Sequence, residues 1–271
     1  MTMRMIIDGL GINVLVCDAG GERKKVATGA PVALILHGGL SDNLSTYYTT
    51  ISSTLTELGM NVILYDRAGY GRSEYRPGCY NLERIFLDID AILDGVGVDT
   101  RVHVIGSSFG GGLAAAYVAL RPERAASLAL LEGQPITPTS RESFAAFLRS
   151  MRYNIDKVVT HYRENSDLSM KAIERMRSMI MDRTYLDDIE ASDLPSLAQL
   201  HAISVPSLGV YGADSTHRTY EGTVESIGHL ENLRIEVIPH ASHFLLYEVL
   251  PTLKGLLHDF YSGPGILGRT S

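Results

Sequence analysis

The sequence has little of several features that would each assign it to a particular class of protein. Its 271 residues include no tryptophan and only two cysteines, Cys17 and Cys79. Two cysteines cannot build a disulfide framework, and their spacing matches no zinc-binding pattern. We therefore expect a reducing compartment and no bound metal ion. With 45% hydrophobic and 20% charged residues, the chain otherwise has the composition of a globular protein with one large domain.

Positive charge is also scarce, because 24 Lys and Arg residues stand against 31 Asp and Glu residues, a net charge of −7. A protein that neutralises nucleic-acid phosphates or lies on anionic lipid needs a surplus of Lys and Arg. We therefore expect no nucleic-acid partner and no membrane partner. The N-terminus has no apolar run of secretory length and no cleavage site of small residues, so a cytoplasmic location is expected.

Apolar runs bounded by Gly or Pro recur along the chain, and helical patterns separate most of them. The runs cover residues 31–39, 60–69, 101–108, 126–135, 206–214 and 233–240, and the helical stretches cover 44–58, 81–95, 109–121, 216–229 and 244–261. Continuous apolar strands alternating with helices predict a parallel sheet covered on both faces. Residues 1–17 predict an antiparallel hairpin around a turn at 8–11. The expected fold is a doubly wound α/β core with an antiparallel start.

The alternation breaks once, between Pro135 and about Leu200, where helical periodicity continues without a strand. We expect a core of residues 1–135 and 201–271 and an inserted helical lid of residues 136–200. Within the lid, residues 169–183 form an amphipathic pattern whose apolar face includes Met176. Two interpretations stay open for this face. It packs against the core, or it lets Met176 and its neighbours contact an apolar ligand, because methionine adapts to irregular shapes.

The sharpest chemical signal is GSSFG at residues 106–110, which matches G-x-S-x-G between a predicted strand and a predicted helix. The pattern needs glycine two residues before and after the serine because the strand-to-helix turn is tight. Ser108 would then stand at a helix N-terminus, where free N–H groups favour an oxyanion. The alternative is a glycine-rich turn without catalysis. A phosphate-binding loop is disfavoured, since the lysine-containing pattern is absent, and we expect no cofactor.

A serine hydroxyl is a weak nucleophile at neutral pH and needs a histidine base held by a carboxylate. Among nine histidines, His243 follows the last predicted strand in PHASHF, at the sheet edge where it could reach Ser108. His240, in the same stretch, is its close rival. His37 is set apart because it precedes Gly38 and Gly39 after an earlier strand. The other histidines are expected in ordinary structural or surface positions, and His217 is placed among these.

Taken together, HGG at 37–39, DRAGYGRS at 66–73, GSSFGG at 106–111 and a late histidine make the chain resemble the α/β-hydrolase superfamily over nearly its whole length. The resemblance implies an α/β-hydrolase fold with a helical cap, Ser108 as nucleophile and His243 as base. It also implies an oxyanion hole formed by the backbone N–H of Phe109 and that of Gly39 or Leu40. In DRAGYGRS, the Asp and Arg are expected to hold the loop rather than to touch substrate.

The acid of the triad is the point at which the sequence departs from the common family pattern. A strand in many members ends in G-x-x-D, but residues 212–215 read GADS, so that Asp214 is displaced by one position. A shift of one residue at a strand end turns the side chain to the other face. Glu132 ends the preceding strand, and some branches of the family take their acid from that position. We favour Glu132 and keep Asp214 as the alternative.

The sequence therefore predicts a cofactor-independent serine hydrolase that cleaves an ester, thioester or lactone through an acyl-enzyme on Ser108. Its partner would be a small apolar or acyl-type molecule, and a homodimer is compatible with the sequence. Two other functions stay open. The same triad serves carbon–carbon bond hydrolysis or a lyase reaction, and some relatives with these residues act as ligand-binding proteins without catalysis.

Overall fold

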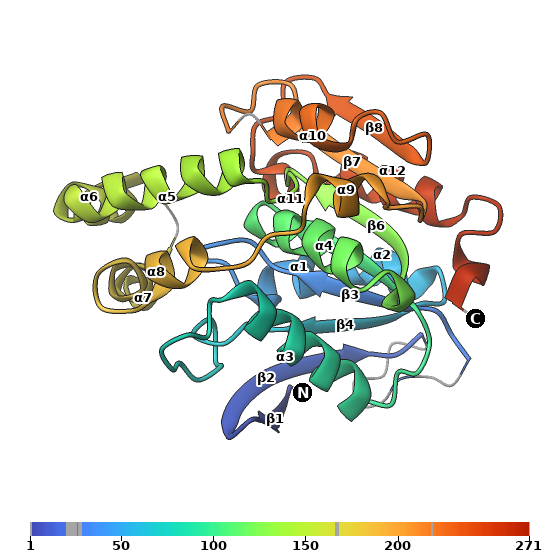
Figure 1. The fold of residues 1–271 in the computed structure, drawn as a ribbon, viewed down its shortest axis with the longest axis horizontal. Helices are drawn as coiled ribbons and strands as arrows, with labels where there is room; N and C mark the ends of the chain where they lie inside the picture. Colours follow the sequence, from blue (N-terminus) through green and yellow to red (C-terminus); the bar gives the residue numbers. More distant parts are fainter. Residues whose placement is uncertain (1, 20–25, 27–28, 166–167, 218, 271) are drawn as a thin grey trace.

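Eight strands form one sheet in the computed structural model, which describes every residue except 1, 20–25, 27–28, 166–167, 218 and 271 (Figure 1). The strand order is β1-β2-β4-β3-β5-β6-β7-β8. The strands span Met3–Ile7 (β1), Leu10–Cys17 (β2), Val32–Leu36 (β3), Asn61–Tyr65 (β4), Val102–Ser107 (β5), Ala125–Leu131 (β6), Ser207–Gly212 (β7) and Leu233–Ile238 (β8). β1 with β2 and β2 with β4 pair antiparallel, and every other neighbouring pair is parallel. The predicted α/β fold with an antiparallel start is confirmed.

The central strands are buried on both faces because helices cover both sides of the sheet. Every residue of β3, β4, β6 and β7 is buried, whereas the edge strands β1 and β8 are partly exposed. One face packs on α1 (Leu44–Thr50), α2 (Ser52–Glu57) and α12 (Leu250–Tyr261). The other face packs on α3 (Leu82–Gly95), α4 (Phe109–Leu120), α9 (Leu197–His201) and α10 (Thr219–Ile227). Two separate apolar layers, one on each face, therefore hold the sheet.

Two of the predicted helices are interrupted. The stretch 44–58 divides at Ile51, where the Ser52 hydroxyl donates to the Tyr47 carbonyl and competes with the helical hydrogen bonds. The stretch 244–261 divides at Val249 into α11 (Leu245–Glu248) and α12, because Pro251 in the first turn of α12 has no N–H with which to continue α11. Short 3₁₀ helices also occur at Pro122–Arg124 and Leu267–Thr270.

Four helices between β6 and β7 extend from one end of the sheet as a separate group, on the left in Figure 1. They are α5 (Pro138–Tyr153), α6 (Ile155–Asn165), α7 (Met170–Met181) and α8 (Tyr185–Glu190), and we call this group the helical lobe. The lobe has a small apolar cluster of its own, built from Met151, Ile155, Val159, Ile173, Met176 and Ile180. The division of the chain into a catalytic core and a lid stays a prediction.

The lobe is attached to the core mainly through α8 and the residues around it. The Tyr185 and Tyr70 hydroxyls are 3.0 Å apart, and the Arg183 guanidinium donates to the Gly69 carbonyl at 2.7 Å. The Ser192 hydroxyl accepts from the backbone N–H of Leu82 at 3.0 Å. These contacts position the lobe over the carboxyl ends of the parallel strands, the edge at which ligands bind in open α/β sheets.

Candidate active site

Ser108 stands between the end of β5 and the first residue of α4, in a strained backbone conformation. Its φ is 52° and its ψ is −123°, in a region that residues with side chains seldom adopt. Gly106 and Gly110 make the turn possible. A Cβ at Gly106 would overlap the carbonyl of Gly110, and one at Gly110 would overlap the carbonyls of Leu36 and His37. The motif therefore needs glycine at both positions, because three segments of the backbone meet at this point.

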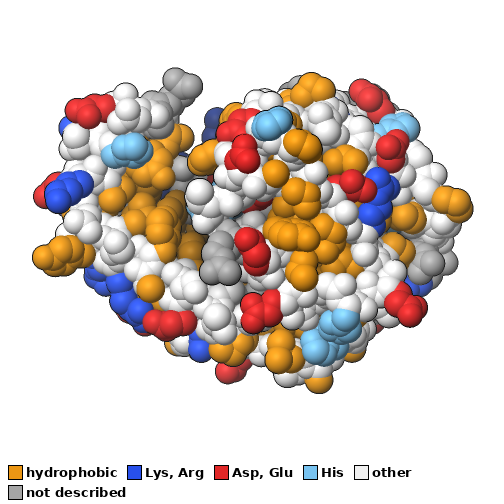
Figure 2. Space-filling model, turned by 90° about the horizontal axis from the view of Figure 1, so that it is seen from above, with side chains coloured by type: hydrophobic (Ala, Val, Ile, Leu, Met, Phe, Trp, Pro, Cys, Tyr) orange, Lys and Arg blue, Asp and Glu red, His pale blue; other side chains and the backbone are white. Residues whose placement is uncertain are grey.

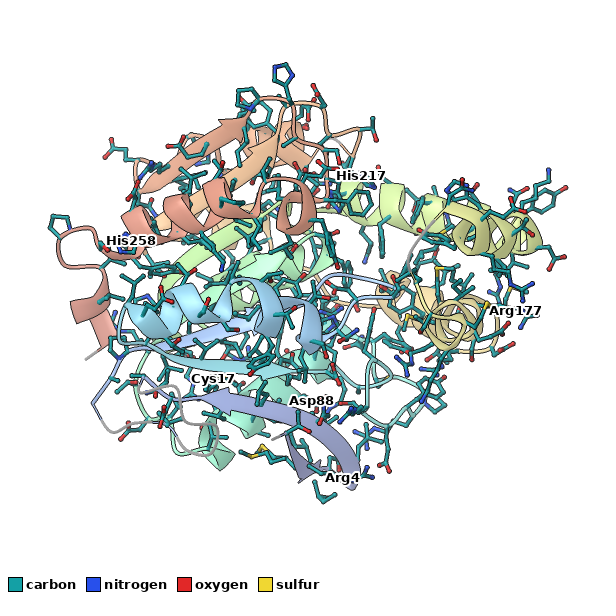
Figure 3. The ribbon with its side chains drawn as sticks, turned by 180° about the vertical axis from the view of Figure 1, so that it is seen from behind. Arg4, Cys17, Asp88, Arg177, His217 and His258 are labelled. Carbon is teal, nitrogen blue, oxygen red and sulfur yellow. The ribbon has the colours of Figure 1, made fainter. Side chains whose placement is uncertain are left out.

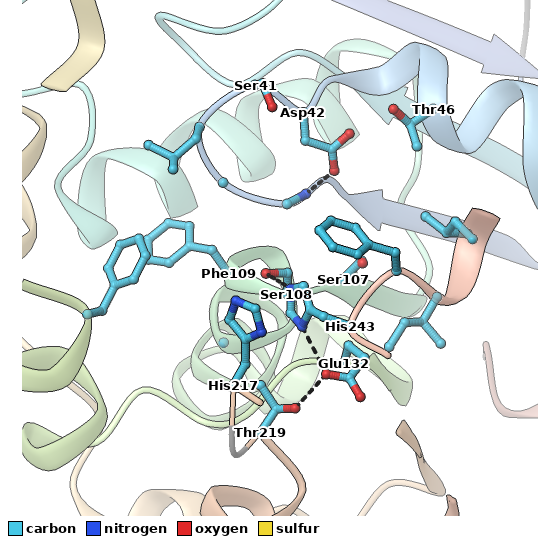
Figure 4. A pocket seen from close by; sticks show the side chains of 18 of the residues that line it. Ser41, Asp42, Thr46, Ser107, Ser108, Phe109, Glu132, His217, Thr219 and His243 are labelled. Atoms are coloured by element: carbon cyan, nitrogen blue, oxygen red, sulfur yellow. Dashed lines mark hydrogen bonds and ion pairs between the residues drawn. The ribbon is translucent and has the colours of Figure 1, made fainter. Parts of the chain in front are cut away.

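Three side chains from three loops form one hydrogen-bonded line (Figure 4). The Nε2 atom of His243 is 2.9 Å from the Ser108 hydroxyl, and its Nδ1 atom is 2.9 Å from Oε2 of Glu132. Ser108 follows β5, Glu132 follows β6, and His243 follows β8, so all three lie at the same edge of the sheet. This arrangement can pass a proton from the hydroxyl to the imidazole while the carboxylate holds the ring.

Hydrogen bonds from neighbouring segments of the chain hold the Glu132 side chain in place. Its side chain is buried, and its carboxylate accepts from the Gly212 backbone N–H at 2.6 Å and from the Ser215 and Thr219 hydroxyls at 2.8 Å each. Burial by itself would raise the pKa of this carboxyl, but the hydrogen bonds from His243, Gly212, Ser215 and Thr219 outweigh it and lower the pKa. Glu132 is therefore ionised at neutral pH, as a partner of an imidazolium must be.

Asp214 and His240, the alternative acid and base from the sequence, are not part of this hydrogen-bonded line. Asp214 is exposed, and among the described residues no hydrogen bond joins its carboxylate to His243. The residue after it, Ser215, turns inward and donates to Glu132 instead. His240 is exposed as well and has a φ of 58°. Because Asp214 is displaced by one residue, the hydroxyl of Ser215 lies at the position where most of the family has a carboxylate.

The three predicted oxyanion donors lie beside Ser108. A Cβ on Gly39 would stand 3.5 Å from the Cβ of Phe109, so the HGG turn and the start of α4 are in direct contact. Leu40 follows with a φ of 53°. Within the part of the chain that the structure describes, no hydrogen bond takes the backbone N–H of Gly39, Leu40 or Phe109. By contrast, the N–H of Gly38 is used, since it donates to Asp42 at 2.7 Å.

Buried polar residues hold this turn in shape. Arg67 is buried, donates to the carbonyls of His37 and Gly38, and lies over the Tyr70 ring at 4.5 Å. His37 donates from Nδ1 to the Gly38 carbonyl and accepts at Nε2 from the Arg67 backbone N–H. Burial and the Arg67 charge lower the pKa of His37 well below its usual range, so the ring is neutral. Through these hydrogen bonds, Arg67 of the DRAGYGRS loop fixes the conformation of the HGG turn.

A cavity of about 750 Å³ opens above the line of Ser108, His243 and Glu132, between the core and the helical lobe. Figure 2 shows this face of the molecule, with a hollow beside the lobe in which hydrophobic side chains gather. One side is apolar and carries three phenyl rings, with Phe109 stacked on Phe144 at 5.0 Å and Phe144 on Phe147 at 6.3 Å. The other side is polar and is lined by Ser41, Asp42, Asn43, Thr46 and Ser107.

Met176 does not line this cavity, which corrects the prediction that it contacts substrate. It is completely buried in the apolar cluster of the lobe, where α5, α6 and α7 pack against one another. The methionine face of α7 therefore stabilises the lobe itself. The lobe residues that do line the cavity come from elsewhere and include Phe144 and Phe147 of α5, Tyr162 of α6 and Ala172 of α7.

Other site residues carried little or no signal in the sequence. Thr219 and Ser215 are ordinary hydroxyl residues until the fold brings them to Glu132. The aromatic spacing of Phe144 and Phe147 on one helix was the only available hint of the phenyl wall. His217 is exposed, as expected, but it also lines the cavity and stacks on His243 with 4.0 Å between ring centroids.

No group of three or more His, Cys, Asp or Glu side chains among the described residues is arranged to hold a metal ion. No helix within the same residues is long and apolar enough to span a bilayer.

Comparison with known proteins agrees with the fold. The family model described as alpha/beta hydrolase fold matches residues 31–165. An alpha/beta hydrolase enzyme from a Medee basin deep-sea metagenome superimposes with a TM-score of 0.70 over 96% of this chain and 98% of that chain, at 16% sequence identity. The chain belongs to the alpha/beta hydrolase superfamily.

The relatives with related sequences are hydrolases of different specificity. A proline iminopeptidase of Thermoplasma volcanium is 29% identical over 58% of this chain, and the match spans only 48% of that enzyme. Lipase 1 of Psychrobacter immobilis is 26% identical over 88% of this chain and 78% of that enzyme. A 2-hydroxy-6-oxononadienedioate/2-hydroxy-6-oxononatrienedioate hydrolase of Klebsiella pneumoniae is 24% identical over 90% of this chain and 93% of that enzyme. These likenesses support hydrolase activity as the general class.

Proposed function

We propose that this protein is a serine hydrolase that cleaves a carboxylic ester, thioester or lactone without a cofactor. The observation that carries the proposal is the position of His243, whose two ring nitrogens are each 2.9 Å from an oxygen, one on Ser108 and one on Glu132. On this proposal His243 is the base for the hydroxyl and Glu132 is the ionised carboxylate that holds the base, which is what activation of a serine requires. The lipase relative supports the choice of an ester.

In the proposed reaction, Ser108 attacks the substrate carbonyl while Nε2 of His243 takes the hydroxyl proton. Glu132 stabilises the imidazolium through Nδ1, and the carbonyl oxygen becomes an oxyanion held by the N–H of Phe109 and that of Gly39 or Leu40. Collapse of this intermediate breaks the ester bond, and His243 returns the proton to the leaving group. A water molecule, activated by the same histidine, then releases the acid and restores Ser108.

The cavity suggests how a substrate would lie. An apolar acyl group would lie along the phenyl rings of Phe109, Phe144 and Phe147, because these rings begin at the residue next to the nucleophile. The leaving group would face the polar side around Ser41 and Thr46. On this proposal the helical lobe acts as a lid that selects the acyl group, while the core carries the chemistry.

The experiment that tests the proposal is labelling with a fluorophosphonate, followed by intact-mass measurement and peptide mapping. The reagent reacts with a serine that its own base and oxyanion hole activate, so we expect a single adduct on Ser108 and none in Ser108→Ala. Hydrolysis of aryl esters should disappear in the same variant. A folded protein that forms no adduct and turns over no ester would refute the proposal and favour a ligand-binding protein without catalysis.

Carbon–carbon bond hydrolysis is the second candidate, and one observation favours it. The name of the Klebsiella pneumoniae relative gives its substrate a 6-oxo group, which is a ketone and not an ester carbonyl. The same three side chains would serve this reaction. Slow aryl-ester turnover beside rapid cleavage of a vinylogous diketone, both dependent on Ser108, would replace the ester proposal by this one.

A further inference from the structure

His217 contributes a second imidazole to the site, beside the one that contacts Ser108. It lies in the loop between β7 and α10 and lines the cavity (Figure 4). Its ring is stacked on that of His243, with 4.0 Å between centroids and 25° between ring planes. The two imidazoles are therefore stacked, unlike the edge-to-face contact that Phe244 makes with His243 at 82°.

The stack covers the part of the His243 ring that hydrogen bonds leave free. Both ring nitrogens are engaged in the ring plane, by Ser108 and by Glu132. These hydrogen bonds lie in the ring plane and contact neither face of the His243 ring. The His217 ring covers one face and restricts tilting of the His243 ring. His217 is also expected to be neutral, because burial and the neighbouring His243 lower its pKa.

We propose that His217 is a positioning residue for the reaction, whose neutral ring face holds the His243 ring plane and stabilises the imidazolium that forms when Ser108 attacks. The inference rests on the proposed function, since it needs His243 to become charged. A cation in face contact with a neutral π system is stabilised by the electron density of that face. The effect therefore falls on the step in which His243 gains the proton.

The test compares three substitutions at His217 that distinguish the effects of its π face, its bulk and its charge. His217→Phe keeps a flat π face and cannot titrate, His217→Leu keeps most of the bulk without a π face, and His217→Ala removes both. His258→Ala is the control, because His258 is exposed on α12, at the far end of the core from His217 (Figure 3). Each protein is labelled with a fluorophosphonate, and the labelling rate constant, which does not depend on the folded fraction, is measured with kcat and KM for an aryl ester.

We expect His217→Leu and His217→Ala to reduce the labelling rate constant and kcat roughly tenfold, within the range of a cation–π contact, with little change in KM. His217→Phe should recover most of the loss, and His258→Ala should match the wild type. Equal rates for His217→Leu and His217→Phe would overturn the inference, since packing alone would then explain the stack. If the wild type itself forms no adduct, the proposed function fails, which is a separate result.

Discussion

Glu132 and Met176 are both almost completely buried, at 1% and 0% exposure, but their surroundings are opposite. Glu132, at the end of β6, accepts hydrogen bonds from one backbone amide, two hydroxyls and an imidazole. Met176, in the helical lobe, packs in the apolar cluster of the lobe. Hydrogen bonds have strict geometry, whereas apolar packing tolerates changes of shape at similar volume.

This difference indicates that the strand-end loops and the helical lobe have different roles at the site. The strand-end loops hold Ser108, His243 and Glu132 at hydrogen-bond distances, which proton transfer needs. The lobe provides a wall of phenyl rings that stack without hydrogen bonds. Substitutions in the loops should therefore reduce the rate of the chemical step, and substitutions in the lobe should change which substrates bind.

The largest effect is expected from Glu132→Gln. The amide is neutral, cannot balance an imidazolium, and favours the wrong tautomer of His243, so kcat should fall by about 10³ to 10⁴. The matched control is Asp214→Asn, which changes an exposed carboxylate and should leave kcat within about twofold. Steady-state kinetics on an aryl ester measures both. The opposite ranking would assign the acid to Asp214 and reject the proposed line of three residues.

A smaller effect, and on binding, is expected from Phe144→Ala in the lobe. The substitution removes the middle ring of the phenyl wall, so KM for an octanoyl ester should rise roughly tenfold, in keeping with the apolar area lost. An acetyl ester is too short to reach this ring and should respond much less. Phe147→Ala is the comparison, because that ring is 46% exposed and should matter less. A uniform fall in kcat for both esters would contradict the division between core and lobe.

The contribution of Glu132 to the free energy of unfolding should depend on pH in a way that identifies its charge state. Its pKa is lowered in the folded state, so the stability that it contributes is complete above its ordinary pKa of 4.5 and is lost as the pH falls through the lowered value. Urea unfolding of wild type and Glu132→Gln should therefore show a difference in free energy of unfolding that is constant at neutral pH and narrows as the pH falls below 4.5. A difference that is unchanged by acid would contradict the ionised, hydrogen-bonded state.

The smallest effect is expected from Met176→Leu. The two side chains have similar volumes, so the lobe cluster should repack at a cost below about 1.5 kcal/mol, and thermal unfolding should shift by only a few degrees. Because Met176 does not line the cavity, kcat and KM for every ester should stay within about twofold. A selective change in KM for long acyl chains would mean that α7 shapes the cavity after all.

Much of this molecule was accessible from local patterns in the sequence. Strand positions followed from apolar runs, since a buried parallel strand must be apolar along its whole length. Gly106 and Gly110 marked the turn around Ser108, because no larger residue fits between the meeting backbones. The interrupted helices at Ile51 and Val249 were missed, because the periodicity of the side chains continues across both breaks.

What the sequence by itself determined is therefore the order of the elements and the position of the strained turn at Ser108, since both depend on contacts within a few residues. What only the tertiary structure decided is which side chains meet across loops far apart in the chain. Glu132 is 111 residues from His243, and the hydroxyls of Ser215 and Thr219 become its partners only when β6, β7 and β8 lie side by side. The same holds for His217, whose stack on His243 depends on two loops from neighbouring strands and has no trace in local sequence.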